Sequence, residues 1–226
     1  MEKNQKNYYT HARPDLLGLV PKTAKKILDV GCGEGVLGKQ LKQSNNDIEI
    51  MGVEINQKAC ETAKRNLNLA ILGNIEKIDL PFKENYFDCV ITGDVLEHLV
   101  DPWGTLNKLK PFLKEDGLII SSIPNIRYYK VLIRLFRGYW DYMDQGILDK
   151  THLRFFSLIN IKELFEEAGF KIKDIRRNMV SSRGFRILNY LSLNQLQEFL
   201  TYQYYIVAAK DSGLLLQKSK RQVIQF

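Results

Sequence analysis

The sequence predicts an α/β protein with a mostly parallel sheet and helices on both faces. Two stretches carry this prediction. The apolar run from Ile27 to Val30 is typical of a buried parallel strand, and it leads into a glycine-rich turn and a helix that begins near Val36. The segment 48–54 then alternates like a second strand and precedes another helix. At 226 residues, the chain is long enough to bury a core without disulfides or metals.

The turn after the first strand carries glycine at positions 31, 33 and 35. Glycine at every second position indicates a backbone that passes close to another group, as a strand–turn–helix does at a nucleotide site. A dinucleotide turn needs a small residue where Val36 stands, and Glu34 would repel a pyrophosphate. Asp29 suits a positively charged ligand. The residues therefore favour S-adenosylmethionine over NAD or FAD, with a purely structural tight turn as the alternative.

The second strand ends in Glu54, just before a helix that starts near Asn56. A carboxylate at this place can accept hydrogen bonds from both ribose hydroxyls of a nucleoside. A solvated acid at a strand end is the simpler alternative.

These motifs resemble those of the class I S-adenosylmethionine-dependent methyltransferases, over roughly residues 8–177. The likeness includes Asp29-x-Gly31-x-Gly33-x-Gly35, Glu54, and the fourth-strand segments 87–91 and 94–99. It implies a Rossmann-like seven-stranded sheet of order 3-2-1-4-5-7-6 with an insertion on the acceptor side. The stretches 122–125 and 146–156 resemble a bacterial subgroup associated with glycan and cell-envelope pathways.

The remaining elements follow from periodicity and turn residues. A short helix is expected from Asp15 to Val20, and another after Pro102. Further helices are expected at 56–68 and 160–168, and further strands at 69–72, 86–92 and 118–123, with antiparallel strands at 170–175 and 202–209.

The resemblance implies a set of cofactor-binding residues. Tyr9 and Arg13 would cover the methionine end, with Arg13 meeting its carboxylate, although an ordinary packing helix explains this arm equally well. Asn74 stands where the family usually has an acid that accepts from the adenine amino group, so the Asn74 side-chain carbonyl would replace that acceptor. Ile75 would pack against the adenine ring. The complete expected set is Tyr9, Arg13, Asp29, Gly31, Gly33, Glu54, Ile55, Asn74, Ile75, Gly93 and Asp94.

Methyl transfer requires the acceptor to be held in line with the activated carbon, and a base where the acceptor atom carries a proton. His98 and His152 are the candidate bases, and Arg154 is the candidate anion-binding residue of the acceptor site. His98 lies four residues beyond Asp94, at a spacing that allows a hydrogen bond on one helix face. A structural role is the alternative for each of the three. His98 would fix its own loop, His152 would fix the insertion through a contact with Asp149, and Arg154 would form a local salt bridge. No cluster has metal-ligand spacing along the chain, so no metal site is predicted.

The chain is interpreted as one domain, residues 1–210, followed by a tail at 211–226. Insertions at 125–156 and 178–200 are expected to form the acceptor lid. In the first of them, Arg127, Lys130, Arg134 and Arg137 are spaced to share one helix face. That face is either a solvated lid or a contact surface for anionic lipid.

Charge is unevenly distributed, with net −1 over residues 1–100 and net +8 over the remainder. The basic half favours an acidic acceptor, an anionic membrane surface or nucleic acid. Three cysteines without disulfide or metal spacing, a polar start and the absence of a membrane-length apolar run favour the cytoplasm, with peripheral contact at the inner membrane face left open.

The leading hypothesis is a methyltransferase that uses S-adenosylmethionine on an oxygen atom of a small-molecule or glycan acceptor. RNA methylation is the first alternative, although the sequence lacks a recognisable RNA-binding module and the amine-methylating motif of DNA enzymes. A non-catalytic membrane-associated binding protein is the second. The oligomeric state is open.

Overall fold

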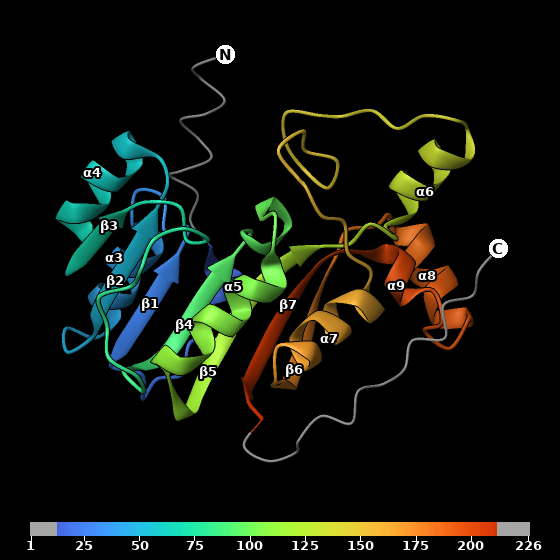
Figure 1. Ribbon diagram of the computed structural model, residues 1–226. Helices are drawn as coiled ribbons and strands as arrows, with labels where there is room; N and C mark the ends of the chain where they lie inside the picture. The colour runs from blue at the N-terminus through green and yellow to red at the C-terminus, as the bar shows by residue number, and fades with distance from the viewer. Residues whose placement is uncertain (1–12, 212–226) are drawn as a thin grey trace.

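The computed structural model describes residues 13–211, apart from the side chains of residues 186 and 188. Seven strands form one sheet in the order β3-β2-β1-β4-β5-β7-β6 (Figure 1), which confirms the predicted order. The strands are β1 Lys26–Val30, β2 Glu49–Glu54, β3 Leu69–Leu72, β4 Phe87–Gly93, β5 Leu113–Pro124, β6 Phe170–Met179 and β7 Thr201–Lys210.

The first five strands pair in parallel, whereas β7 runs antiparallel to both of its neighbours, β5 and β6. Because parallel strands end at a common edge, the residues after β1, β2 and β4 come together there. The fifth strand begins five residues earlier than predicted and pairs with β4 from Leu113, with an irregularity in the register before Leu118.

The helices are α2 Pro14–Leu17, α3 Val36–Ser44, α4 Gln57–Asn66, α5 Pro102–Leu109, α6 Tyr129–Phe136, α7 Leu158–Glu167, α8 Arg183–Leu191 and α9 Gln197–Leu200, with 3-10 turns η1 Leu96–His98 and η2 Lys110–Phe112. Side chains of α5 and α7 pack on one face of the sheet, and those of α2, α3 and α4 pack on the other. Successive side chains of β1 point to opposite faces of the sheet, so Ile27 belongs to the core on one face and Leu28 to the core on the other.

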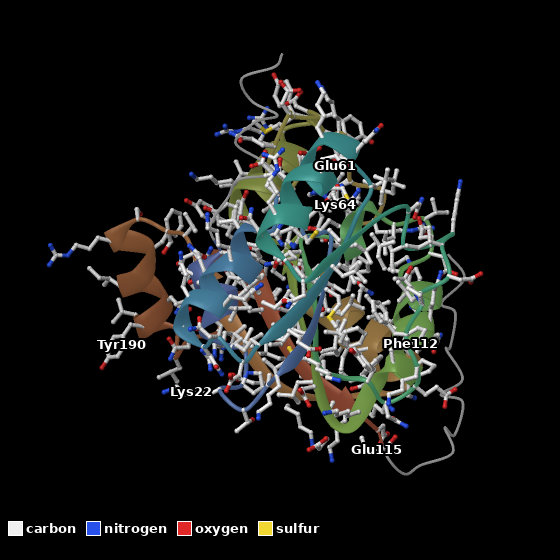
Figure 2. The ribbon with its side chains drawn as sticks, turned by 90° about the vertical axis from the view of Figure 1, so that its left-hand side faces the viewer. Lys22, Glu61, Lys64, Phe112, Glu115 and Tyr190 are labelled. Atoms are coloured by element: carbon white, nitrogen blue, oxygen red, sulfur yellow. The ribbon has the colours of Figure 1, made fainter. Side chains whose placement is uncertain are left out.

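Side chains at helix starts fix where these elements begin. The Asn56 side chain accepts from the Ala59 N–H and caps α4, and the Asp101 side chain caps α5 in the same way through Gly104. On the outer surface of α4, Glu61 and Lys64 form an ion pair of 2.7 Å (Figure 2). Helix α4 therefore presents a polar face outward and buries the small residues Ala59, Cys60 and Ala63.

The first predicted insertion holds α6 and a long loop around a small core of its own, which contains Tyr128, Val131, Ile147 and Leu148. The expected four-residue basic helix face is wrong. The helix spans Tyr129–Phe136, so Arg127 and Arg137 lie outside it. Arg127 pairs with Glu198 of α9 at 2.6 Å, and Arg134 pairs with Asp141.

The second predicted insertion contains α8 and α9, and α8 stands off the sheet with Tyr190 exposed (Figure 2). Of the predicted tail, residues 212–226 lie outside the described part of the chain. Among residues 13–211, no helix combines the length and the apolar character needed to cross a bilayer.

The glycine turn yields a stability prediction. Gly31 has φ +70°, and a Cβ there would lie 2.5 Å from Val95 Cγ2. Gly31→Ala should therefore lower the free energy of unfolding by about 2 kcal/mol, measured by urea denaturation. Gly184→Ala is the control, since it meets nothing within 4 Å in α8. Equal stability of the two variants would contradict this account of the turn.

Candidate functional site

The candidate site lies where β1, β2 and β4 end side by side in the middle of the sheet (Figure 1). The glycine turn follows β1, Glu54 closes β2 and Gly93 closes β4. Three of the predicted groups are thus brought to one edge by the parallel pairing of β1 with both neighbours.

Glu54 faces the glycine turn, as a ribose-binding role requires. Its side chain is buried, its Oε2 accepts from the Gly33 N–H at 2.8 Å, and its Oε1 accepts from the Asn56 N–H at 2.8 Å. Each carboxylate oxygen has further acceptor capacity beyond one backbone donor. The carboxylate is therefore oriented by the backbone and still able to accept hydroxyl donors.

Asp29 is a buried acid with one unsatisfied oxygen. It is 3% exposed, and its Oδ1 accepts no hydrogen bond from the described residues. Burial, opposed by Arg13 and reinforced by Glu54, raises the pKa of Asp29 from 3.8 to about 7. An unpaired buried carboxylate of this kind is stabilised by a cationic ligand.

A polar network surrounds the end of β4. The Asp94 backbone N–H donates to Ser122 Oγ at 3.0 Å, and its Oδ1 accepts from Ser122 Oγ at 2.8 Å and from the Gln203 amide. Arg13 donates to the Gly93 carbonyl and lies 3.7 Å from Asp94 Oδ2. Arg13 thus lies at the end of β4, and its contact with the methionine carboxylate stays a prediction. Asp94 is held with its backbone at φ 53°.

The residues expected around the adenine divide into exposed and buried positions. Ile55 is 67% exposed beside Glu54, whereas Ile75 is buried in the core. The Asn74 side-chain oxygen accepts from the Glu76 N–H at 2.8 Å, so it caps the turn that follows β3. The adenine roles of Ile55, Asn74 and Ile75 stay predictions, and Tyr9 lies outside the described residues.

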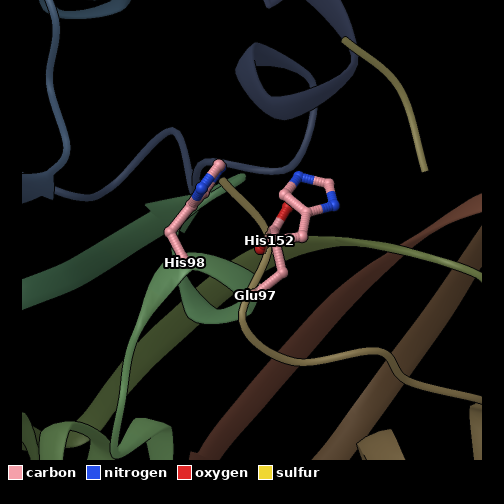
Figure 3. A group of neighbouring side chains, drawn as sticks. All are labelled: Glu97, His98 and His152. Carbon is pink, nitrogen blue, oxygen red and sulfur yellow. The ribbon is translucent and has the colours of Figure 1, made fainter. Parts of the chain in front are cut away.

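His98 and His152 come together with Glu97, although 54 residues separate the two histidines (Figure 3). Their rings meet edge to face with centroids 4.6 Å apart. His98 Nδ1 lies 3.2 Å from the Thr151 carbonyl oxygen, and His152 Nδ1 lies 2.9 Å from that of Ile147. Burial and the neighbouring His152 lower the pKa of His98, which favours the neutral, proton-accepting form.

Glu97 is a buried acid that is not among the predicted site residues. Its side chain is 1% exposed, and neither carboxylate oxygen accepts a hydrogen bond from the described residues. Burial, with the charge of Asp94 added, raises the pKa of Glu97 well above its usual value. Its position beside His98 was visible in the sequence, but its closeness to His152 was not.

Arg154 is anchored rather than directed at a ligand. Its Nε and Nη2 donate to the Val100 carbonyl, and its guanidinium lies 6.0 Å from the centre of the Trp103 ring. The predicted alternative of a local salt bridge is therefore replaced by a contact with a backbone carbonyl. An acceptor-binding role for Arg154 stays a prediction.

Comparison with known proteins identifies the family. A family model described as a methyltransferase domain matches residues 1–175. The chain belongs to this methyltransferase family. A crystal structure of a SAM-dependent methyltransferase from Archaeoglobus fulgidus shares the fold, with a TM-score of 0.65 and 19% identity over 92% of this chain and 99% of that one.

S-adenosylmethionine is the cofactor that this family and fold imply, and the residues of the site fit that molecule. Asp29 Oδ1 accepts no hydrogen bond from the described residues, and each Glu54 oxygen can accept a donor beyond its backbone N–H, which are the acceptors that a cationic nucleoside needs. A Cβ at Gly31 would lie 2.5 Å from Val95 Cγ2, so the glycine turn is packed directly against the segment that follows β4. The donor groups match a ligand that is positively charged and lacks phosphate.

Two curated relatives of the methyltransferase act on oxygen, according to their names. A ubiquinone biosynthesis O-methyltransferase from Acinetobacter baylyi is 25% identical over 67% of this chain and 65% of its own length. A malonyl-[acyl-carrier protein] O-methyltransferase from Acetivibrio thermocellus is 34% identical over 53% of this chain and 46% of its own. The chain thus spans about two thirds of the first relative and less than half of the second, and neither name refers to a glycan.

The buried Asp29 gives the methyltransferase a pH-dependent stability. The folded protein retains the Asp29 proton up to about pH 7, whereas the unfolded chain releases it near pH 3.8. Deprotonation of the unfolded state over this window lowers wild-type stability as pH rises. Asp29→Asn removes that loss. The free energy of unfolding of Asp29→Asn minus that of wild type should therefore be about 2–3 kcal/mol greater at pH 8 than at pH 5.

Urea denaturation of both proteins at pH 5 and pH 8, without cofactor, measures this difference. Other titrating groups are common to both proteins and cancel in the comparison. A stability gap that is the same at both pH values would show that Asp29 titrates normally.

Proposed function

We propose that the protein transfers the methyl group of S-adenosylmethionine to an oxygen atom of a small acidic acceptor. The observation that carries this proposal is the pair of neighbouring imidazoles, His98 and His152, beyond the carboxyl end of β4. Two relatives that are O-methyltransferases by name support the choice of oxygen.

The cofactor, when bound, would supply a methyl carbon whose bond to the sulfonium sulfur breaks as the acceptor oxygen bonds to it, which leaves neutral S-adenosylhomocysteine. Glu54 and Asp29 hold and orient it through the ribose and the cationic end. His98 accepts the acceptor's hydroxyl proton as the oxygen attacks, because its lowered pKa keeps it neutral. His152 packs against His98 and positions its ring. Holding the acceptor oxygen in line with the methyl carbon supplies the remaining rate acceleration.

A glycan acceptor fits the same chemistry, since sugar hydroxyls and uronic acids also present oxygen nucleophiles. RNA is less well supported, because several basic groups of the second half are paired locally. These are Arg127 with Glu198, Arg134 with Asp141, Lys150 with Asp144 and Arg176 with Asp174. A small molecule is therefore the better-supported acceptor.

A peripheral membrane contact is part of this proposal. Phe136 is 94% exposed at the end of α6, next to the exposed Ile133 and Leu135 and near Arg137. Exposed apolar side chains beside basic ones are suited to an anionic lipid surface. Such a contact would give the site access to acceptors that are dissolved in or anchored to a membrane.

The cofactor assignment predicts a specific loss of affinity. Glu54→Ala should weaken binding of S-adenosylhomocysteine by about 100-fold or more, because two hydrogen bonds to an ionised acceptor are lost. Glu49→Ala is the matched control, since it removes an exposed acid from the start of the same strand. Isothermal titration calorimetry measures both. Equal affinity of the Glu54 variant and wild type would refute the assignment.

The acceptor is identified by methyl transfer from labelled S-adenosylmethionine to phenols, carboxylic acids, acidic sugars, RNA and lipid-linked glycans in anionic vesicles. With the acceptor that reacts, His98→Gln should lower kcat by about 100-fold or more while S-adenosylhomocysteine binding is retained. An unchanged kcat would remove His98 as the base, and exclusive methylation of RNA would overturn the small-acceptor proposal.

A further inference from the structure

The buried Glu97 lacks the partner that a buried carboxylate needs. It is 1% exposed, and both of its oxygens are without a hydrogen bond from the described residues. Burying an ionised carboxylate is costly unless it is paired with a cation or bound to a metal. The side chain therefore either keeps a proton or binds a cation that comes from solution.

Two imidazoles stand beside this carboxylate in a defined orientation. One ligand atom each from Glu97, His98 and His152 lies within 4.8 Å of the other two (Figure 3). His152 Nδ1 faces the Ile147 carbonyl at 2.9 Å, and His98 Nδ1 faces the Thr151 carbonyl at 3.2 Å. An imidazole that donates from Nδ1 to a carbonyl carries its lone pair on Nε2, which is the arrangement of most metal-binding histidines.

Backbone hydrogen bonds hold the two parts of the cluster together. The Glu97 carbonyl accepts from the Leu153 N–H at 2.8 Å and from the Arg154 N–H at 3.0 Å. The loop that carries His152 is thus fixed against the η1 turn that carries Glu97 and His98. Thr151 is fixed in turn by Asp149, whose Oδ1 accepts from its N–H at 2.8 Å.

We propose that Glu97, His98 and His152 form a binding site for a divalent transition-metal ion, with Zn²⁺ as the best match. Two imidazoles and one carboxylate are the protein ligands of open zinc sites, which leave a fourth position for another molecule. Imidazole ligands disfavour Mg²⁺ and Ca²⁺, which take oxygen ligands. The ion would also neutralise the buried charge of Glu97.

The site requires only small side-chain movements. Ligand atoms of a tetrahedral zinc ion, each at about 2.0–2.1 Å from the metal, lie roughly 3.4 Å apart. Three atoms already within 4.8 Å of one another reach that separation by side-chain rotation. Both histidines are partly accessible, so an ion has access from solvent. Ion binding in this site does not rest on the proposed methyl transfer. A proton and the ion compete for His98 Nε2, so His98 would act as a base only while the ion is absent.

Calorimetric titration of the chelator-treated full chain with zinc chloride, without cofactor, tests the site. Wild type should bind one ion per chain, and His152→Ala and Glu97→Gln should each weaken binding by about 100-fold or more. Asp144→Asn is the control, because it removes an exposed acid of the same insertion that pairs with Lys150. Zinc should raise the thermal midpoint of wild type and the control, but not of the two ligand variants.

Substitution with Co²⁺ adds a spectroscopic readout, since a site with two histidines and a carboxylate should give visible absorption bands that His152→Ala lacks. Binding that is absent in wild type, or equally strong in His152→Ala, would overturn the proposal. S-adenosylhomocysteine titration of the same variants shows that they are folded. It also separates a failure of the metal site from a failure of the proposed function.

Discussion

The structure of the site depends on the carboxylate of Glu54. Through the N–H groups of Gly33 and Asn56, this side chain ties the glycine turn after β1 to the start of α4. The turn needs such a tie because its glycines adopt positive φ and offer no side chains of their own. Burial, with the Glu54 charge added, raises the pKa of Asp29. The two acids thus differ: Glu54 is held by backbone N–H groups, whereas Asp29 Oδ1 accepts no hydrogen bond from the described residues.

Much of the fold and of the cofactor edge was predictable because its signals are local. Strand ends, glycine spacing and the acid at position 54 lie within short segments, and parallel pairing brings them to one edge. The basic face was predicted wrongly because side-chain spacing does not show where a helix begins. Tyr128 is the N-cap of α6 with a non-helical ψ of 130°, and the Arg127 side chain before it pairs with Glu198.

The closeness of Glu97 to His152 could not be predicted from the sequence, for a different reason. It depends on the return path of a loop more than 50 residues away, which is fixed by backbone hydrogen bonds at Leu153 and Arg154. The spacing of Glu97, His98 and His152 along the chain therefore did not indicate that they share a site. The edge of the sheet thus has two unsatisfied acids, one suited to a cationic cofactor and one flanked by imidazoles.

The proposed cofactor site depends most on Glu54, which is expected to accept hydrogen bonds from the ribose of a nucleoside bound above the glycine turn. A crystal structure of the chain with S-adenosylhomocysteine measures this directly. The account predicts both ribose hydroxyls within hydrogen-bond distance of the Glu54 carboxylate, at about 2.5–3.0 Å. A nucleoside bound elsewhere, or a Glu54 side chain turned away from it, would contradict the account.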